Sequence, residues 1–370
     1  MRTDRCFSAR RLTALMALAI TGLPGAGHAD PLDPLGFASL GTLSLGAGSY
    51  FINTSGVAPT LLGVGNAVLY TGVLFDQGTA FDRQIAVFDF QAITVAAGAT
   101  LTATGDRPLA LLSKTSFQFA GILDAAGRRG GDQGAGVAGV GGPGAGAGGM
   151  GSVGGGQAQA GAGPGGGLGG YDGLGNGSWG GGGAYGGAGT AINPFLPPAT
   201  AYGDLPHQLL AGSGGGGTGR NLFGSGAGGG GGGGAVEMGA LSHLTLAVSA
   251  QVLATGAEGG GGLAIISGGG SGGGLFFHAP NITFEGSIAG LAQARADGDS
   301  GGRIAFMTAD GTVAGNLNSV TVSGSANGHP GVITFNRLAP PVPEPATLGL
   351  MLVGLLGVAG AAKRTARRIA

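Results

Sequence analysis

The sequence is poor in charged residues, which make up 9% of its 370 positions. Their signs are unevenly distributed: residues 1–29 carry a net charge of +3, residues 30–342 carry −7 and residues 343–370 carry +3. Nucleic acids and anionic lipid surfaces are bound mainly by clustered Lys and Arg. The acidic central part of the chain therefore argues against nucleic acid as a partner.

Cysteine is almost absent, and the single one, Cys6, lies in a segment with the features of a signal peptide. Four arginines precede the apolar stretch 12–23, and the small-x-small sequence Gly27-His28-Ala29 follows it. Because this stretch is too short to span a membrane, we expect cleavage of residues 1–29 between Ala29 and Asp30. The exported chain then has no thiol, which excludes disulfides and catalytic cysteines.

The export route stays open. Arg10-Arg11 is the kind of pair found in twin-arginine signals, although the residues after it fit that signal poorly. The general secretory route is the alternative.

Residues that carry catalysis are few and scattered. His207, His243, His278 and His329 are not at metal-ligand spacing to one another. Matches to the dinucleotide and nucleophile-elbow motifs fall in glycine-rich turns without a following helix. A polysaccharide-cleaving site would need clustered carboxylates and a base, and the sequence has no such cluster. We therefore expect the protein not to be an enzyme.

The densest group of charges, residues 295–303, contains two candidate metal ligands. Asp297 and Asp299 lie two apart in a glycine-containing turn and can together bind Ca²⁺. The EF-hand pattern fails, because Thr308 stands where position 12 of such a loop requires Glu. We favour a solvated turn and expect no cofactor, with Ca²⁺ as the alternative.

Glycine is abundant, at 90 of 370 residues against a usual share of about 7%. Between the glycines lie brief apolar runs rich in Val, Ile, Thr and Phe, such as residues 85–90 and 117–123. No window shows sustained helical periodicity. The pattern predicts short strands and an all-β fold.

A loose strand–turn–strand repeat appears on both sides of the most glycine-rich part. Leu244, Ile282 and Val320 begin similar alternating strands and are 38 residues apart. A second set of buried-looking strands is predicted at residues 108–112, 262–266, 274–277 and 302–306. Equal spacing of this kind predicts a parallel β-helix-like solenoid over residues 30–126 and 235–341. A β-sandwich or jelly roll with long glycine loops is the alternative.

Residues 127–234 interrupt this pattern with a long glycine-rich insert. Ordering the backbone costs about 1–2 kcal/mol per residue, and this segment has almost nothing apolar to bury. We therefore expect a flexible insert with a largely solvated backbone. Packed polyglycine helices are the alternative.

The C-terminal residues 342–370 have three parts. Pro343, Glu344 and Pro345 favour an extended, exposed segment. Residues 346–362 carry no charge, and as a helix they would cover roughly 26 Å, close to the hydrocarbon core of about 30 Å. We expect a transmembrane helix there. The basic tail, residues 363–370, should stay in the cytoplasm. Its orienting residues are Lys363, Arg364, Arg367 and Arg368.

This tripartite tail resembles the PEP-CTERM sorting signal. The resemblance implies that Pro343, Glu344 and Pro345 are recognised by an exosortase, a membrane-embedded protease that removes the helix. It further implies transient anchoring in the inner membrane and then release to the cell surface or the extracellular matrix. The resemblance covers about 28 of 370 residues, and it concerns the destination of the protein rather than the role of its body.

Together these features predict an exported, non-enzymatic structural protein of the cell surface or of an extracellular matrix such as a biofilm. Extracellular polysaccharide is the expected partner outside the cell. The alternatives are an adhesin that binds a glycan or another surface, and a polysaccharide-active enzyme on a β-helix.

Overall fold

The computed structural model describes residues 31–338 apart from short gaps at 79–83, 155, 173–177, 192–194, 222–223, 264, 288–289, 292, 296–297 and 326–327. The predicted signal peptide and the predicted transmembrane helix lie outside the described residues. Within the described part of the chain, no helix is both long enough and apolar enough to cross a membrane.

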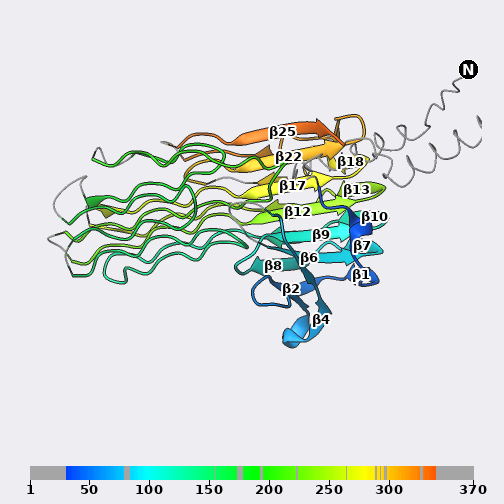
Figure 1. Ribbon diagram of the computed structural model, residues 1–370, viewed down its shortest axis with the longest axis horizontal. Helices are drawn as coiled ribbons and strands as arrows, with labels where there is room; N and C mark the ends of the chain where they lie inside the picture. Colours follow the sequence, from blue (N-terminus) through cyan, green and yellow to red (C-terminus); the bar gives the residue numbers. More distant parts are fainter. Residues whose placement is uncertain are drawn as a thin grey trace, which may run out of the picture.

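Three large sheets carry most of the regular structure (Figure 1). In spatial order, the first sheet contains β1 (Thr42–Leu45), β7 (Ala92–Val95), β10 (Ser116–Phe119), β13 (His243–Leu246), β18 (Asn281–Phe284) and β23 (Ala314–Gly315). The second contains β24 (Val320–Thr321), β21 (Gln293–Arg295), β14 (Gln251–Leu253), β11 (Ile122–Asp124), β8 (Ala99–Thr104), β2 (Gly48–Asn53), β3 (Thr60–Leu62) and β4 (Val68–Thr71). The third contains β25 (Val332–Arg337), β22 (Arg303–Thr308), β17 (Gly274–His278), β12 (Ala235–Ala240), β9 (Leu109–Ser113), β6 (Ile85–Phe90) and β5 (Val73–Phe75).

The remaining elements are small. Two antiparallel pairs are formed by β15 (Gly261–Gly262) with β16 (Ile265–Ile266) and by β19 (Gly286–Ser287) with β20 (Gly290–Leu291). The helical turns among the described residues are the 3₁₀ segments η1 (Pro34–Gly36) and η2 (Val64–Asn66).

The chain visits the three sheets in a fixed cycle. It runs from β6 to β7 to β8, then through β9, β10 and β11, and repeats the third–first–second order until β25. Except for β3, β4 and β5, the strands of these sheets pair in parallel. The predicted all-β fold with parallel strands is confirmed, and the pairing differs from the antiparallel sheets of a sandwich.

The main core lies between the three sheets. We call one passage of the chain through the third, first and second sheets a coil. The core side chains of successive coils lie in register. In β8 and β10, buried residues alternate with more exposed ones, as expected for strands with one face inward. Phe277, Phe306 and Phe335 occupy equivalent positions of β17, β22 and β25. Their rings stack with centroid separations of 5.3 and 5.2 Å. Stacked identical side chains are an effective way to stabilise neighbouring parallel strands.

The repeat was only partly predictable. Leu244 and Ile282 are Cα partners in the first sheet, as their spacing predicts. The prediction is wrong for Val320, which pairs with Ala294 in the second sheet, because the last coil is shorter than the one before it. Residues 262–266 are also not a coil strand, since they contribute to the antiparallel pair of β15 and β16.

The glycine-rich insert forms an extended bundle with residues 268–273 and 298–302, and its segments run side by side beyond the end of the sheets (Figure 1). Residues 211–219 form its centre and are all buried. The amides of Gly212, Gly215 and Thr218 donate to the carbonyls of Gly233, Gly230 and Ala227. Those of Gly214 and Gly217 donate to Ala162 and Gln159, and those of Gly216 and Gly219 donate to Gly181 and Ser178.

Every third amide of this segment therefore points to the same neighbour. That is the periodicity of an extended helix with three residues per turn, whose backbone groups point outward in three directions. A β-strand reaches only two neighbours. The expectation of a solvated backbone is wrong for residues 211–219 and the segments that pair with them, and the arrangement agrees with the alternative of packed polyglycine helices. The physical reason is that chains without side chains approach closely enough to pair their backbones with several neighbours at once.

Candidate functional site

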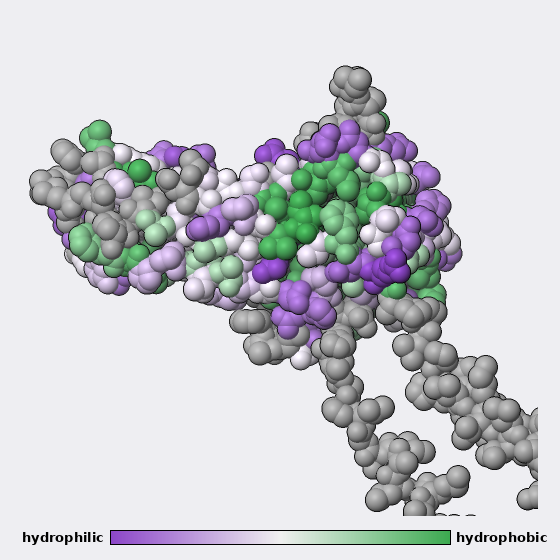
Figure 2. Space-filling model, turned by 90° about the horizontal axis from the view of Figure 1, so that it is seen from above, coloured by the Kyte–Doolittle hydropathy of each residue, from purple (hydrophilic) through white to green (hydrophobic). Residues whose placement is uncertain are grey.

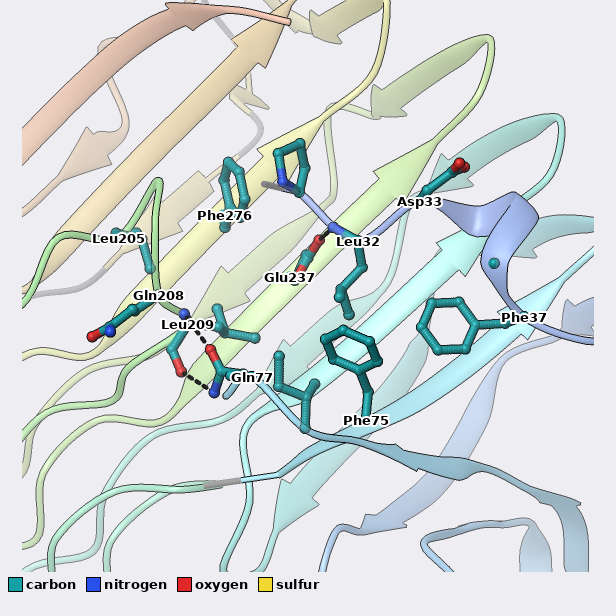
Figure 3. Close-up of a pocket in the computed structure, with 13 residues that line it drawn as sticks. Leu32, Asp33, Phe37, Phe75, Gln77, Leu205, Gln208, Leu209, Glu237 and Phe276 are labelled. Carbon is teal, nitrogen blue, oxygen red and sulfur yellow. Dashed lines mark hydrogen bonds between the residues drawn. The ribbon is translucent and has the colours of Figure 1, made fainter. Parts of the chain in front are cut away.

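The outer face of the third sheet carries a cavity of about 330 Å³ (Figure 3). Two segments cross this face and form its walls: residues 31–37, just after the predicted cleavage site, and residues 205–209 of the insert. Its lining is mainly apolar and includes Leu32, Phe37, Phe75, Ile85, Leu205, Leu209 and Phe276. Strands of the third sheet are consequently buried on both faces, as in β6 and β12.

Local contacts hold the two crossing segments in place. Asp33 caps η1 by accepting a hydrogen bond from the Leu35 amide at 2.9 Å. Phe37 packs edge-on against Phe75, with 5.7 Å between ring centroids. Gln77 binds both backbone groups of Leu209: its Oε1 accepts from the amide at 2.9 Å and its Nε2 donates to the carbonyl at 3.4 Å.

Glu237 and His278 form a buried pair beside the cavity. The Glu237 carboxylate, on β12, accepts a hydrogen bond from the Leu32 amide at 2.7 Å. The same oxygen lies 2.9 Å from His278 Nε2, but the two groups are not aligned for a hydrogen bond. Gly239 makes room for the imidazole, because a Cβ atom there would overlap the ring. The carboxylate thus joins residues 31–37 to the sheet.

A second buried charge lies on the same face. Lys114 Nζ is 3.1 Å from Asp89 Oδ2, and it also donates to the carbonyls of Pro34 and Phe37. Burial raises the pKa of Asp89, and the neighbouring ammonium partly offsets this rise. Lys114 therefore links the crossing segment to the sheet and compensates a buried carboxylate.

The polar side chains in and beside the cavity contact the segments that cross the sheet. Glu237, Lys114 and Gln77 are all engaged with the backbone of the crossing segments. The walls can receive an apolar group. Among the residues that the structure describes, no three His, Cys, Asp or Glu side chains lie close enough to hold a metal ion.

Of the two candidate calcium ligands, Asp297 lies outside the described residues and Asp299 lies in the bundle. Asp299 Oδ2 accepts from the Thr190 hydroxyl at 2.6 Å and from the Thr190 amide at 3.2 Å. Ser325 Oγ is 3.3 Å from Oδ1. Burial raises the pKa of Asp299, and these hydrogen bonds partly lower it again. Asp299 thus joins three distant segments, and calcium binding stays an untested alternative.

The buried groups of the outer face could not be found from the sequence. They come from strands far apart in the chain and match no motif. The one available signal was a charged residue within an apolar strand, as Asp89 is in 85–90. Such a residue is buried only when its partners lie on other strands.

Comparison with known proteins bears on the C-terminus. Residues 341–368 match the family model of the PEP-CTERM protein-sorting motif. The chain carries a PEP-CTERM sorting signal. This signal implies an exported protein that is transiently anchored in the membrane and sorted by an exosortase. Neither a curated protein nor a solved structure is significantly similar to the chain.

The PEP-CTERM signal follows directly on the folded body. The Leu338 amide still donates to Thr308 at the end of the third sheet, and the matched region begins at residue 341. The predicted sorting residues all lie outside the described part of the chain: Pro343, Glu344 and Pro345, Ala29 and Asp30, and Lys363, Arg364, Arg367 and Arg368.

Proposed function

We propose that the protein is an exported, non-enzymatic structural component of the cell surface or of an extracellular matrix such as a biofilm. Its body is a parallel β-helix-like solenoid extended by a polyglycine bundle. Residues 346–362 anchor the precursor as a transmembrane helix until an exosortase removes them.

The observation that carries this proposal is the backbone pairing of the bundle. Residues 211–219 are held by amide–carbonyl hydrogen bonds to several neighbouring segments. Such bonds do not depend on the ionisation of side chains, so this backbone pairing should persist across the pH and salt changes met outside a cell. A long, stiff element of this kind suits a spacer or scaffold.

The outer face of the third sheet supports the same reading. Glu237 and Lys114 bind the backbone of the segments that cross it, so these charged groups stabilise the fold. Extracellular polysaccharide is the proposed partner, because the sorting signal directs the protein to the cell surface or the extracellular matrix.

A surface-binding role, as in an adhesin, is the second candidate. The cavity beside Phe37, Phe75 and Phe276 is the observation that favours it. Loss of adhesion on filling this cavity, for example by Leu209→Trp, would favour the adhesin over the structural role.

Cell fractionation tests the proposal. Membrane, surface and matrix pools are compared, and the termini of the protein in each are read by mass spectrometry. We expect a surface or matrix form that begins at Asp30 and ends near residues 343–345. Changing Pro343, Glu344 and Pro345 to Ala should trap full-length protein in the inner membrane. Recovery of the unmutated protein only in the inner membrane, with Ala370 still attached, would contradict the sorting.

The proposal that the protein is not an enzyme is tested separately. The mature protein, purified from the surface pool, is incubated with extracellular polysaccharides, and release of reducing or unsaturated ends is followed. We expect none above the buffer control. Cleavage of polysaccharide at ordinary enzymatic rates would overturn the non-enzymatic role and leave the proposed sorting by an exosortase unaffected.

A further inference from the structure

The core is closed at the N-terminal end of the coils. There the antiparallel strands β3, β4 and β5 fold over the first coil. Leu61 of β3 is buried beside its paired residue Ile52 of β2. Tyr70 of β4 packs edge-on against Phe90, with 5.0 Å between ring centroids. Repetitive folds need a terminal unit of this kind to stay soluble.

The C-terminal end has no comparable cover among the described residues. Phe335, the last ring of the stacked column, is 48% exposed. Val313, Leu317, Val320, Val322 and Ile333 pack against the core but remain only partly buried. Figure 2 looks onto the β25 end of the molecule and shows a broad apolar area there. We call this surface the open end.

The backbone of β25 is open on the same side. Among the described strands β25 pairs with β22 alone. The amides of Val332 and Leu338 donate toward β22, to Gly302 and Thr308. Because successive amides of a strand alternate in direction, those of Ile333, Phe335 and Arg337 point to the open side. Exposed edges of this kind are templates for pairing with another strand.

The chain's own continuation is a poor cover. Residues 340, 341, 343 and 345 are prolines, which lack the amide that a further strand would need. The apolar run that follows is the segment assigned to the membrane and to removal. The mature chain therefore keeps only a few proline-rich residues beyond the open end.

We propose that the mature protein pairs with a second copy of itself through the open end, with the two β25 strands antiparallel about a two-fold axis. A two-fold axis brings the same surface of each copy together and closes the assembly at a dimer. With Phe335 opposite Phe335 and Ile333 opposite Arg337 of the other copy, like charges do not face each other, because Arg337 is the only charged residue of β25. The paired Phe335 side chains leave water, and both open edges gain partners.

This proposal rests on the proposed export and removal of the tail, because the anchor controls access to the open end. From residue 338 to residue 343, the extended chain reaches at most about 18 Å. The open end of an anchored precursor is thus held toward the membrane and cannot face a second open end. Removal of the helix frees it.

The test uses mature protein from the surface pool, and sedimentation equilibrium gives its mass. We expect the wild type to have twice the mass of one chain, and Phe335→Lys to halve that mass. The matched control is Phe51→Lys, since Phe51 of β2 is 47% exposed but lies at the capped end; it should leave the dimer intact. A monomeric wild type, a dimer that survives Phe335→Lys, loss of the dimer in Phe51→Lys, or open-ended polymers would each overturn the proposal.

A second measurement does not depend on the folding of a variant. Hydrogen exchange of the wild-type peptide covering 332–338 is compared at dilute and concentrated protein. The proposal expects at least tenfold slower exchange in the concentrated sample, because the amides facing the open side acquire partners. Equal exchange at both concentrations would overturn it. Either failure leaves the fractionation result, and hence the proposed sorting, unaffected.

Discussion

A Cβ atom added to Gly216 would overlap the carbonyl oxygen of Leu168, which belongs to a neighbouring segment of the bundle. The two backbones approach too closely for any side chain, as at the axis of collagen. Gly216 is therefore required by packing. Its amide at the same time donates to Gly181 at 2.8 Å.

Gly216→Ala should lower the free energy of unfolding by about 1–3 kcal/mol or more, because the inserted methyl forces two backbones apart. Chemical denaturation of the mature protein measures the change. Gly154→Ala is the control within the same insert, since a Cβ atom there would meet nothing within 4 Å. It should change stability by no more than about 0.5 kcal/mol. Equal effects of the two variants would mean that the bundle is not packed as described.

Lys114→Met should destabilise the protein by about 3–5 kcal/mol, because it leaves the buried Asp89 carboxylate without its ion pair. The double variant with Asp89→Asn should recover much of this loss, since the uncompensated charge is then gone. The unfolding free energies of the wild type, the two single variants and the double variant together form a double-mutant cycle. Additive losses would show that the two groups do not interact.

Glu237→Ala should cost about 1–3 kcal/mol, because the Leu32 amide loses its buried acceptor. It should also make the chain more open to proteolysis at residues 31–37. Glu258→Ala serves as the control, since Glu258 is exposed, and it should behave like the wild type. Unchanged cleavage in Glu237→Ala would mean that this carboxylate does not hold the crossing segment.

Stability should depend on pH through Asp299. Burial raises its pKa in the folded state above the ordinary value of 3.8. The folded state therefore favours the protonated form, and this contribution is fully present below pH 3.8 and is lost as pH rises through the raised pKa. Asp299→Asn removes the dependence, so the wild type should lose stability relative to this variant between acidic and neutral pH.

Asp310 provides a comparison of opposite sign. Hydrogen bonds from Thr312 lower the pKa of Asp310, so its contribution is present above pH 3.8 and is lost as pH falls through the lowered value. Urea unfolding at several pH values measures both variants. Parallel pH profiles for Asp299→Asn, Asp310→Asn and the wild type would contradict both assignments.

The strands were predictable because their signal is local. Runs such as 85–90 and 274–277 alternate with glycine turns, and each run folds as a strand of the third sheet. The register was predictable only where two coils have equal length, as for Leu244 and Ile282. Val320 was misplaced because the length of a coil depends on its turns, whose size the apolar pattern does not report.

The bundle and the buried ionic groups were not predictable for a different reason. Residues 212–219 carry almost no apolar side chains, so the burial of side chains alone cannot offset the entropy of ordering them. Their stabilisation comes from backbone pairing with segments far away in the chain. Likewise Glu237 and His278 meet only because β12 and β17 are neighbours in the sheet.

Hydrogen exchange of the mature protein tests the central claim, an ordered glycine bundle within an exported structural protein, most directly. The amides of residues 212–219 are all buried, and most donate to carbonyls of other segments. We predict that they exchange as slowly as those of the core strand β9. If these amides exchange at the rate of an unstructured chain while β9 stays protected, the claim of an ordered bundle is wrong. The insert would then be flexible, with a solvated backbone.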